Sequence, residues 1–185
     1  MALYYQKKHC GNDLQFVDEL INNMIEVLIL YGSDDFWKLL KYGTKDALTN
    51  PTYTITLEEK AILSDQNNAS RKIRNTPFAD DIATEQHNEI RIYDGGWRGD
   101  DYNYNITIGF DVICGTDITE LDTNAEYPIR KNAVNVLQHE LLDIFNGSIV
   151  SKNVGEFITD NQRGIPRRFN DKYIGITFTL SGVSG

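Results

Sequence analysis

The residues best suited to hold a metal ion are His139 and Asp143, four positions apart in a stretch that reads as a helix. A zinc-protease motif needs His at both of these positions, so that two imidazoles reach the same ion. Here Asp takes the second position, although the pair could still supply two ligands. A solvated His–Asp pair on the polar side of the helix is the simpler interpretation. We expect neither a metal nor a cofactor.

A second pattern, Asp101-x-Asn103-x-Asn105, begins like a calcium loop. Such a loop needs Gly at its sixth place for a sharp turn and Glu at its twelfth for bidentate ligation. The chain has Ile106 and Val112 at these places. The pattern is better explained as the polar face of a strand that begins here.

Nucleophilic catalysis has little support. The sequence contains no nucleophile elbow, phosphate-binding loop or dinucleotide-binding turn. Cys10 and Cys114 match no disulfide framework and no zinc spacing, and Cys114 lies in a stretch that reads as a strand, where we expect an inert thiol. We therefore name no catalytic residue, but the abundant carboxylates leave a carboxylate- or metal-dependent enzyme open as an alternative.

One cluster of basic residues stands out, formed by Arg163, Arg167, Arg168 and Lys172. It could contact nucleic acid, or it could be a solvated turn. We favour a third interpretation, in which these cations pair with the acidic surface of another subunit. Opposite charges on one protein surface favour self-association in a ring.

Aromatic residues flank a loop rich in Gly and Asp, namely Trp97, Tyr102 and Tyr104. Aromatic side chains are enriched at protein interfaces, although these could equally fold back over a sheet edge. Together with the basic cluster, this loop supplies the residues expected in a subunit or partner interface: Trp97, Arg98, Asp100, Tyr102, Arg163, Arg167 and Arg168.

Apolar residues that recur at helical spacing predict four helices to position these side chains. Ser33 and Gly43 favour the start and the end of the second helix. The helices are expected over about 12–31, 34–42, 57–63 and 129–145, the last with Pro128 in its first turn.

Alternation of apolar and polar residues predicts the strands. In the longest strand, Ile106, Ile108 and Phe110 share one face, whereas Asn105 and Asp111 share the other. The strands are expected over 89–93, 104–114, 148–159 and 173–180, with a turn over 160–171. Residues 64–88 and 94–103 are expected to be extended loops or arms that reach neighbouring subunits.

The helices do not alternate one for one with the strands, which argues against a doubly wound parallel sheet. We expect a single α+β domain over residues 1–185. It should have an antiparallel or mixed β-sheet, an N-terminal helix pair and one long helix packed on one face, plus long extended loops.

The charge balance narrows the function classes. The 18 Lys and Arg against 27 Asp and Glu leave a formal net charge of −9. This argues against a general nucleic-acid binder, which neutralises phosphates with cations, and against adsorption to anionic membranes. The 41% hydrophobic content excludes a disordered tail. We find no signal-peptide pattern or membrane span, and expect a soluble protein made in a cytoplasm.

Several segments together resemble the neck proteins of tailed bacteriophages. The N-terminal half contributes 36–42 (FWKLLKY), 46–48 (DAL) and 57–60 (LEEK). The C-terminal half contributes 105–114 (NITIGFDVIC), 127–130 (YPIR), 145–147 (FNG) and 169–175 (FNDKYIG). The resemblance covers about residues 12–180.

This resemblance implies a small α/β subunit that assembles with itself into a ring, often a hexamer, between the head and the tail tube. Such proteins are tail terminators or head-closure adaptors, contact other neck and tail-tube proteins, and perform no catalysis. We expect a tail terminator, a structural virion protein assembled in the cytoplasm of the bacterial host. A head-closure adaptor and an intracellular binding module without a ring stay open as alternatives.

A ring would also explain the acidity. Double-stranded DNA must pass through the neck channel without specific binding, and a lumen lined with carboxylates repels phosphates. The carboxylate-rich stretch 94–122 motivates this hypothesis.

Overall fold

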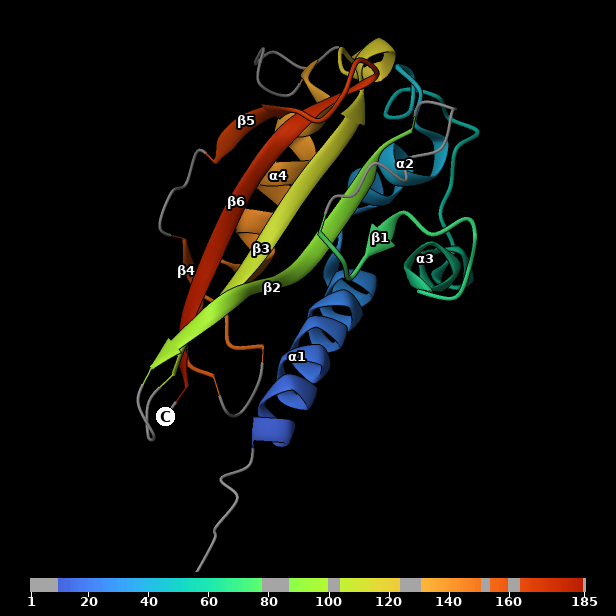
Figure 1. Ribbon diagram of the computed structural model, residues 1–185. Coiled ribbons are helices and arrows are strands. Elements are labelled where there is room, and N and C mark those ends of the chain that lie inside the picture. The colour runs from blue at the N-terminus through green and yellow to red at the C-terminus, as the bar shows by residue number, and fades with distance from the viewer. Residues whose placement is uncertain are drawn as a thin grey trace, which may run out of the picture.

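A mixed six-stranded sheet forms the centre of the protein (Figure 1). The computed structural model describes residues 10–77, 87–99, 104–123, 131–150, 154–159 and 164–184. The strand order is β1 (Ile73–Arg74), β2 (Glu89–Gly99), β3 (Tyr104–Gly115), β6 (Tyr173–Ser184) and β4 (Ile158–Thr159), and β5 (Ile165–Arg168) also pairs with β6. β1 runs parallel to β2, and the other pairs are antiparallel.

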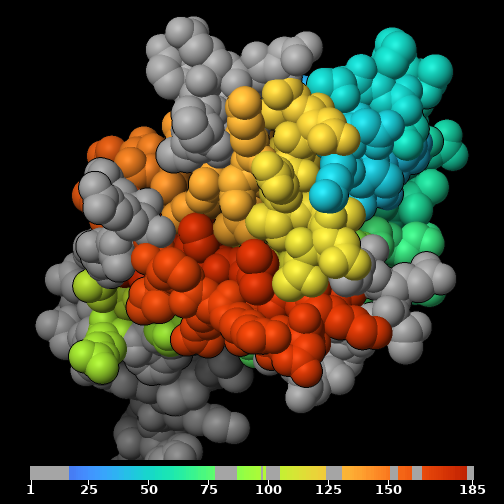
Figure 2. All heavy atoms as spheres, turned by 90° about the horizontal axis from the view of Figure 1, so that it is seen from above, coloured from blue at the N-terminus to red at the C-terminus, as the bar shows by residue number. Residues whose placement is uncertain are grey.

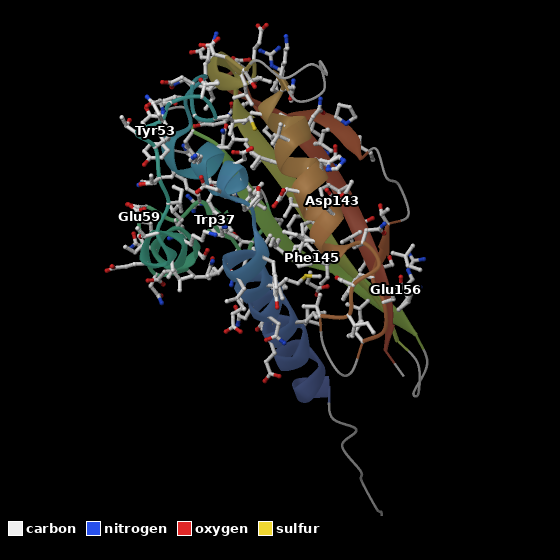
Figure 3. All side chains as sticks on the ribbon, turned by 180° about the vertical axis from the view of Figure 1, so that it is seen from behind. Trp37, Tyr53, Glu59, Asp143, Phe145 and Glu156 are labelled. Carbon is white, nitrogen blue, oxygen red and sulfur yellow. The ribbon has the colours of Figure 1, made fainter. Side chains whose placement is uncertain are left out.

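The helices lie on one side of this sheet. They are α1 (Cys10–Tyr31), α2 (Asp34–Tyr42), α3 (Leu57–Ser64) and α4 (Ala133–Phe145), with a 3₁₀ turn, η1 (Thr116–Ile118), after β3. Figure 1 shows α1 and α4 behind the strands, and the reverse view in Figure 3 shows them in front. We call the opposite side of the sheet the open face. The expected α+β class with a mixed sheet and helices on one face is confirmed.

The hydrophobic core lies between the sheet and the helices, with Phe110 of β3 at its centre. The Phe110 ring stacks on Phe178 of β6 with centroids 4.9 Å apart, and meets Phe145 of α4 at 5.7 Å. Ile106 and Ile108 are also buried. The apolar side of the predicted alternation in β3 therefore faces the helices, where burial removes it from water.

Local signals set the ends of the short helices. The Ser33 side chain accepts a hydrogen bond from the Phe36 N–H, and Gly43 adopts a φ of 53°, which glycine tolerates best. Thr56 and Glu59 form a capping box at the start of α3. The predictions for 34–42 and 57–63 are confirmed to within one residue.

The long helices begin elsewhere than expected. α1 already begins at Cys10. α4 begins at Ala133 rather than near 129, because the Asn132 side chain accepts from the Asn135 N–H and caps the helix there. Pro128 lies outside the described residues.

Several expected loops are strands instead. Residues 94–99 continue β2 and pair with β3 past a bulge between Asp94 and Gly96. Residues 165–168, expected in a turn, form β5, and Ile73–Arg74 form β1 inside the expected 64–88 arm. Conversely, only Ile158–Thr159 form a strand among the described residues of 148–159. An edge strand forms because it pairs with a strand that is distant in the sequence. The pattern of apolar and polar residues within the edge strand does not reveal this partner.

The upper end of the sheet is tied to the helical side. Figure 2 shows the segment that follows β3 (yellow) beside the segment that follows α2 (cyan). The Asp122 N–H donates to the Lys45 carbonyl at 2.8 Å. On α4, the Glu140 Oε1 accepts from the Ser33 N–H at 2.6 Å, which fixes the α1–α2 junction against that helix.

Candidate functional site

Polar side chains form a band across the upper part of the open face. Cross-strand register places Arg91 of β2 beside Asp111 of β3, and Asp111 beside Thr177 of β6. Because side chains alternate along a strand, Glu89 and Arg91 project from this same face. Glu89, Arg91 and Asp111 are nevertheless buried.

Glu89 is the centre of a buried charge network. Its carboxylate accepts from Arg91 Nε at 2.5 Å and from Arg74 Nε at 2.8 Å, and lies 3.3 Å from His87 Nε2. Burial alone raises the pKa of Glu89. The His87 hydrogen bond and the Arg91 and Arg74 charges outweigh this effect, so the pKa lies below its usual value. The His87 ring also meets the Tyr173 hydroxyl at 3.3 Å.

This network attaches β1 and the residues after it to the sheet. Arg74 belongs to β1, and the Arg91 Nη1 donates to the Pro77 carbonyl at 2.8 Å. A buried charge pair costs desolvation energy, and it is retained only where its geometry and hydrogen bonds compensate that cost. We therefore assign the network a structural role, in which it holds this segment together with the buried Ile73 and the pairing of β1 with β2.

Asp111 is a buried carboxylate held by hydroxyl groups. It accepts from Thr177 Oγ1 at 2.5 Å and from the Tyr93 hydroxyl at 3.3 Å. The Tyr93 ring crosses Gly109, where a Cβ would overlap it. Burial, followed by the Asp111 charge, raises the pKa of Tyr93 to about 12, against an opposing effect of the Arg167 charge. Tyr93 thus remains a neutral donor to Asp111.

The buried position of Asp111 corrects one expectation. A channel lined by the carboxylates of 94–122 cannot include this side chain, because it faces Tyr93 and Thr177 inside the protein. Glu120 and Asp122 are exposed after η1 and stay candidates for such a role.

Short polar side chains line the middle of the open face, and an exposed arginine stands at each end of it. Thr107, Thr179 and Ser181 are short and half-buried, and the Thr107 and Ser181 hydroxyls lie 3.3 Å apart. Arg98 opposes Asn105 at the lower end of this face, whereas Arg167 opposes Gly175, level with Ile113 near the upper end, so the two lie eight residues apart along β6, about 27 Å. Both are exposed. We call this area, bordered by Arg98 and Arg167, the arginine surface.

Of the seven predicted interface residues, the structure places Arg98 and Arg167 on the open face, but at opposite ends of it. Arg168 alternates to the other side of β5 and pairs with Asp171 at 3.0 Å, where both side chains are exposed. The backbone of Trp97 belongs to β2, but its side chain lies outside the described residues, as do Asp100, Tyr102 and Arg163.

His139 and Asp143 form the solvated pair expected from the sequence. His139 Nδ1 lies 2.8 Å from Asp143 Oδ2, and the side chains are 67% and 65% exposed. Figure 3 shows Asp143 on α4. Across the described ranges, no group of three or more His, Cys, Asp or Glu side chains is arranged to hold a metal ion.

Cys114 is buried in β3, as expected for a strand thiol. Burial raises its pKa far above the usual value, which keeps the thiol protonated and unreactive.

Among the residues that the structure describes, no helix combines the length and apolar character needed to cross a membrane.

Sequence similarity identifies the family. Residues 33–181 match the family model described as YomW. The chain belongs to the YomW family. The match begins at the N-cap of α2 and ends within β6, so α1 of this YomW member precedes the matched region. No curated protein and no solved structure matches the chain.

The sequence reasoning missed the Glu89 network. Its signal was the order Glu89-Ile90-Arg91-Ile92-Tyr93, in which the charged residues alternate with buried isoleucines and therefore share one face. The same alternation identified the apolar side of this strand. What it could not reveal is that the polar side is buried as well.

Proposed function

We propose that this YomW member is a structural subunit of a ring at the neck of a tailed bacteriophage, where it closes the tail tube as a tail terminator. Support comes from the resemblance to neck proteins, whose segments coincide with elements of the fold. Segment 36–42 lies within α2 and segment 105–114 within β3. Segment 169–175 leads into β6.

The observation that carries the proposal is the difference in charge between α1 and α4 on one side of the sheet and the exposed arginines on the other. Two of the helices on one side, α1 and α4, contain no Lys or Arg, whereas α2 and α3 carry Lys38, Lys41 and Lys60. On the other side, Arg98 and Arg167 are exposed in a chain of net charge −9. Two unlike, complementary surfaces on one subunit generate a closed ring when the rotation between copies closes.

A ring of these subunits would surround DNA with negative charge. The exposed carboxylates beside η1 are candidates for the channel lining, since they repel phosphates and let DNA slide. A ring whose channel carried charges of both signs would contradict this part of the proposal.

Sedimentation velocity and negative-stain electron microscopy of the purified chain test the assembly. We expect rings with a central opening. A monomer at every concentration up to the millimolar range would contradict the proposal and favour a binding module without a ring. Tail tubes co-expressed with the chain separate the two neck roles, because a tail terminator caps tube ends whereas a head-closure adaptor does not. Stoichiometric zinc or manganese by elemental analysis would instead favour an enzyme.

A further inference from the structure

We infer that α1 of one subunit docks on the arginine surface of the next. The inference rests on the proposed self-assembly and names the two surfaces that meet. It follows from the charges and the exposed apolar side chains on the described parts of both surfaces.

The first surface is the solvent side of α1. Asp18, Asn22, Glu26 and Leu30 are exposed and follow one another at four-residue intervals, so they form a stripe along the helix. We call it the α1 stripe. Leu30 is 66% exposed and Tyr31, beside it, is 72% exposed. With no Lys, Arg or His in Cys10–Tyr31, the helix offers carboxylates, amides and two large apolar side chains.

The second surface is the arginine surface, whose charges are opposite to those of the α1 stripe. Arg98 and Arg167 stand at the two ends of the arginine surface, and the side chains between them include short hydroxyls and the half-buried Tyr93. Ile158 opposes Ser181 and Ile165 opposes Thr177, so both isoleucines project from the open face. Each is 58% exposed. Ile165 and Arg167 lie two residues apart on this face of β5, so the Arg167 guanidinium can receive Glu26 while Ile165 covers Leu30 and Tyr31.

The carboxylates of the open face do not oppose this contact. Glu89 is neutralised by Arg74 and Arg91, and Asp111 is buried against hydroxyl groups. Among the described strand residues of this face, the charges that reach solvent are therefore arginines, in a molecule otherwise rich in acid.

Pairing through the sheet edge is a poorer alternative. At that edge β5 carries Pro166, which has no N–H to donate, next to Arg167 and Arg168. Proline and charged residues on an edge strand oppose the addition of another strand. The open face, rather than this edge, is the surface suited to a second copy.

Repetition of this contact between successive subunits can produce a closed ring. α1 covers one side of the sheet and the arginine surface lies on the other, so each subunit offers both halves of the contact (Figure 1). A contact between unlike surfaces is heterologous and repeats from copy to copy until it closes.

Charge reversal tests the contact in the full chain. We expect Arg167→Glu and Glu26→Arg each to weaken assembly about tenfold or more by sedimentation velocity, because each places like charges across the contact. The double variant Arg167→Glu/Glu26→Arg should recover rings, since the pair is restored with its sign reversed. Lys45→Glu is the matched control, because Lys45 is exposed outside both surfaces. Circular dichroism confirms that each variant is folded.

The outcomes separate the inference from the proposed function. A monomeric wild type contradicts the ring itself. If the wild type and Arg167→Glu form rings equally well, the arginine surface is not the contact and the inference fails while the ring stands. If Arg167→Glu abolishes assembly and the double variant does not restore it, α1 is not the occupant and the inference fails.

Discussion

The Arg91 guanidinium donates from Nε to the Glu89 carboxylate at 2.5 Å, and both side chains are fully buried. They stand two residues apart on one face of β2, so the strand itself sets their distance. Each charge needs the other there, because the desolvation cost of a single buried ion is not offset by a counter-charge. The pair is therefore a sensitive point of the fold.

Replacing Glu89 should destabilise the protein strongly. Glu89→Gln leaves Arg91 buried without its counter-charge, and we expect the free energy of unfolding to fall by about 3 kcal/mol. Urea unfolding followed by circular dichroism measures it. Asp171→Asn is the control, because it breaks the exposed pair with Arg168 and should leave the midpoint unchanged. Equal effects of the two substitutions would show that the buried network contributes nothing.

The Glu89 carboxylate should also make the free energy of unfolding depend on pH in the acidic range. The pKa of Glu89 is lowered from 4.5 in the folded chain, so the unfolded chain binds its proton first as pH falls. Its stabilisation is therefore fully present above pH 4.5 and is lost as pH falls through the folded pKa. Unfolding free energies measured across this range should decline less steeply for Glu89→Gln than for the wild type. Parallel pH profiles would refute the linkage.

Gly32 allows the close approach of α1 and Trp37. A Cβ there would lie 2.6 Å from the Leu28 carbonyl oxygen and 2.7 Å from Trp37 Nε1, which itself donates to that carbonyl. We expect Gly32→Ala to lower stability by about 1–3 kcal/mol through overpacking. Thermal unfolding measures the loss. Asn67→Ala, at an exposed position, should leave the transition in place. An unchanged transition for both would mean that the junction relaxes freely.

The Cys114 thiol should resist modification until the protein unfolds. In a Cys10→Ser background, we expect no reaction with Ellman's reagent in buffer and one thiol per chain in denaturant, because Cys114 is buried and its pKa is raised by burial. Rapid labelling of the folded variant would show that β3 opens readily.

The sequence by itself determined the elements whose signals are local. Ser33 and Gly43 delimit α2, and the alternation through Phe110 predicts the apolar side of β3, because caps and periodicity act within a few residues. It also indicated the solvated His139–Asp143 pair, since side chains four residues apart on a helix are neighbours.

Only the tertiary structure decided what depends on distant partners. β5 exists because it pairs with β6, and the glycine-rich segment after Tyr93 is a strand because β3 lies beside it. Asp111 and Glu89 look like surface carboxylates in the sequence, yet they are buried because hydroxyls and cations from other strands surround them. Arg98 and Arg167, far apart along the chain, share one face only through strand register. Pairing between distant segments cannot be read from local periodicity, because it depends on which strand lies alongside.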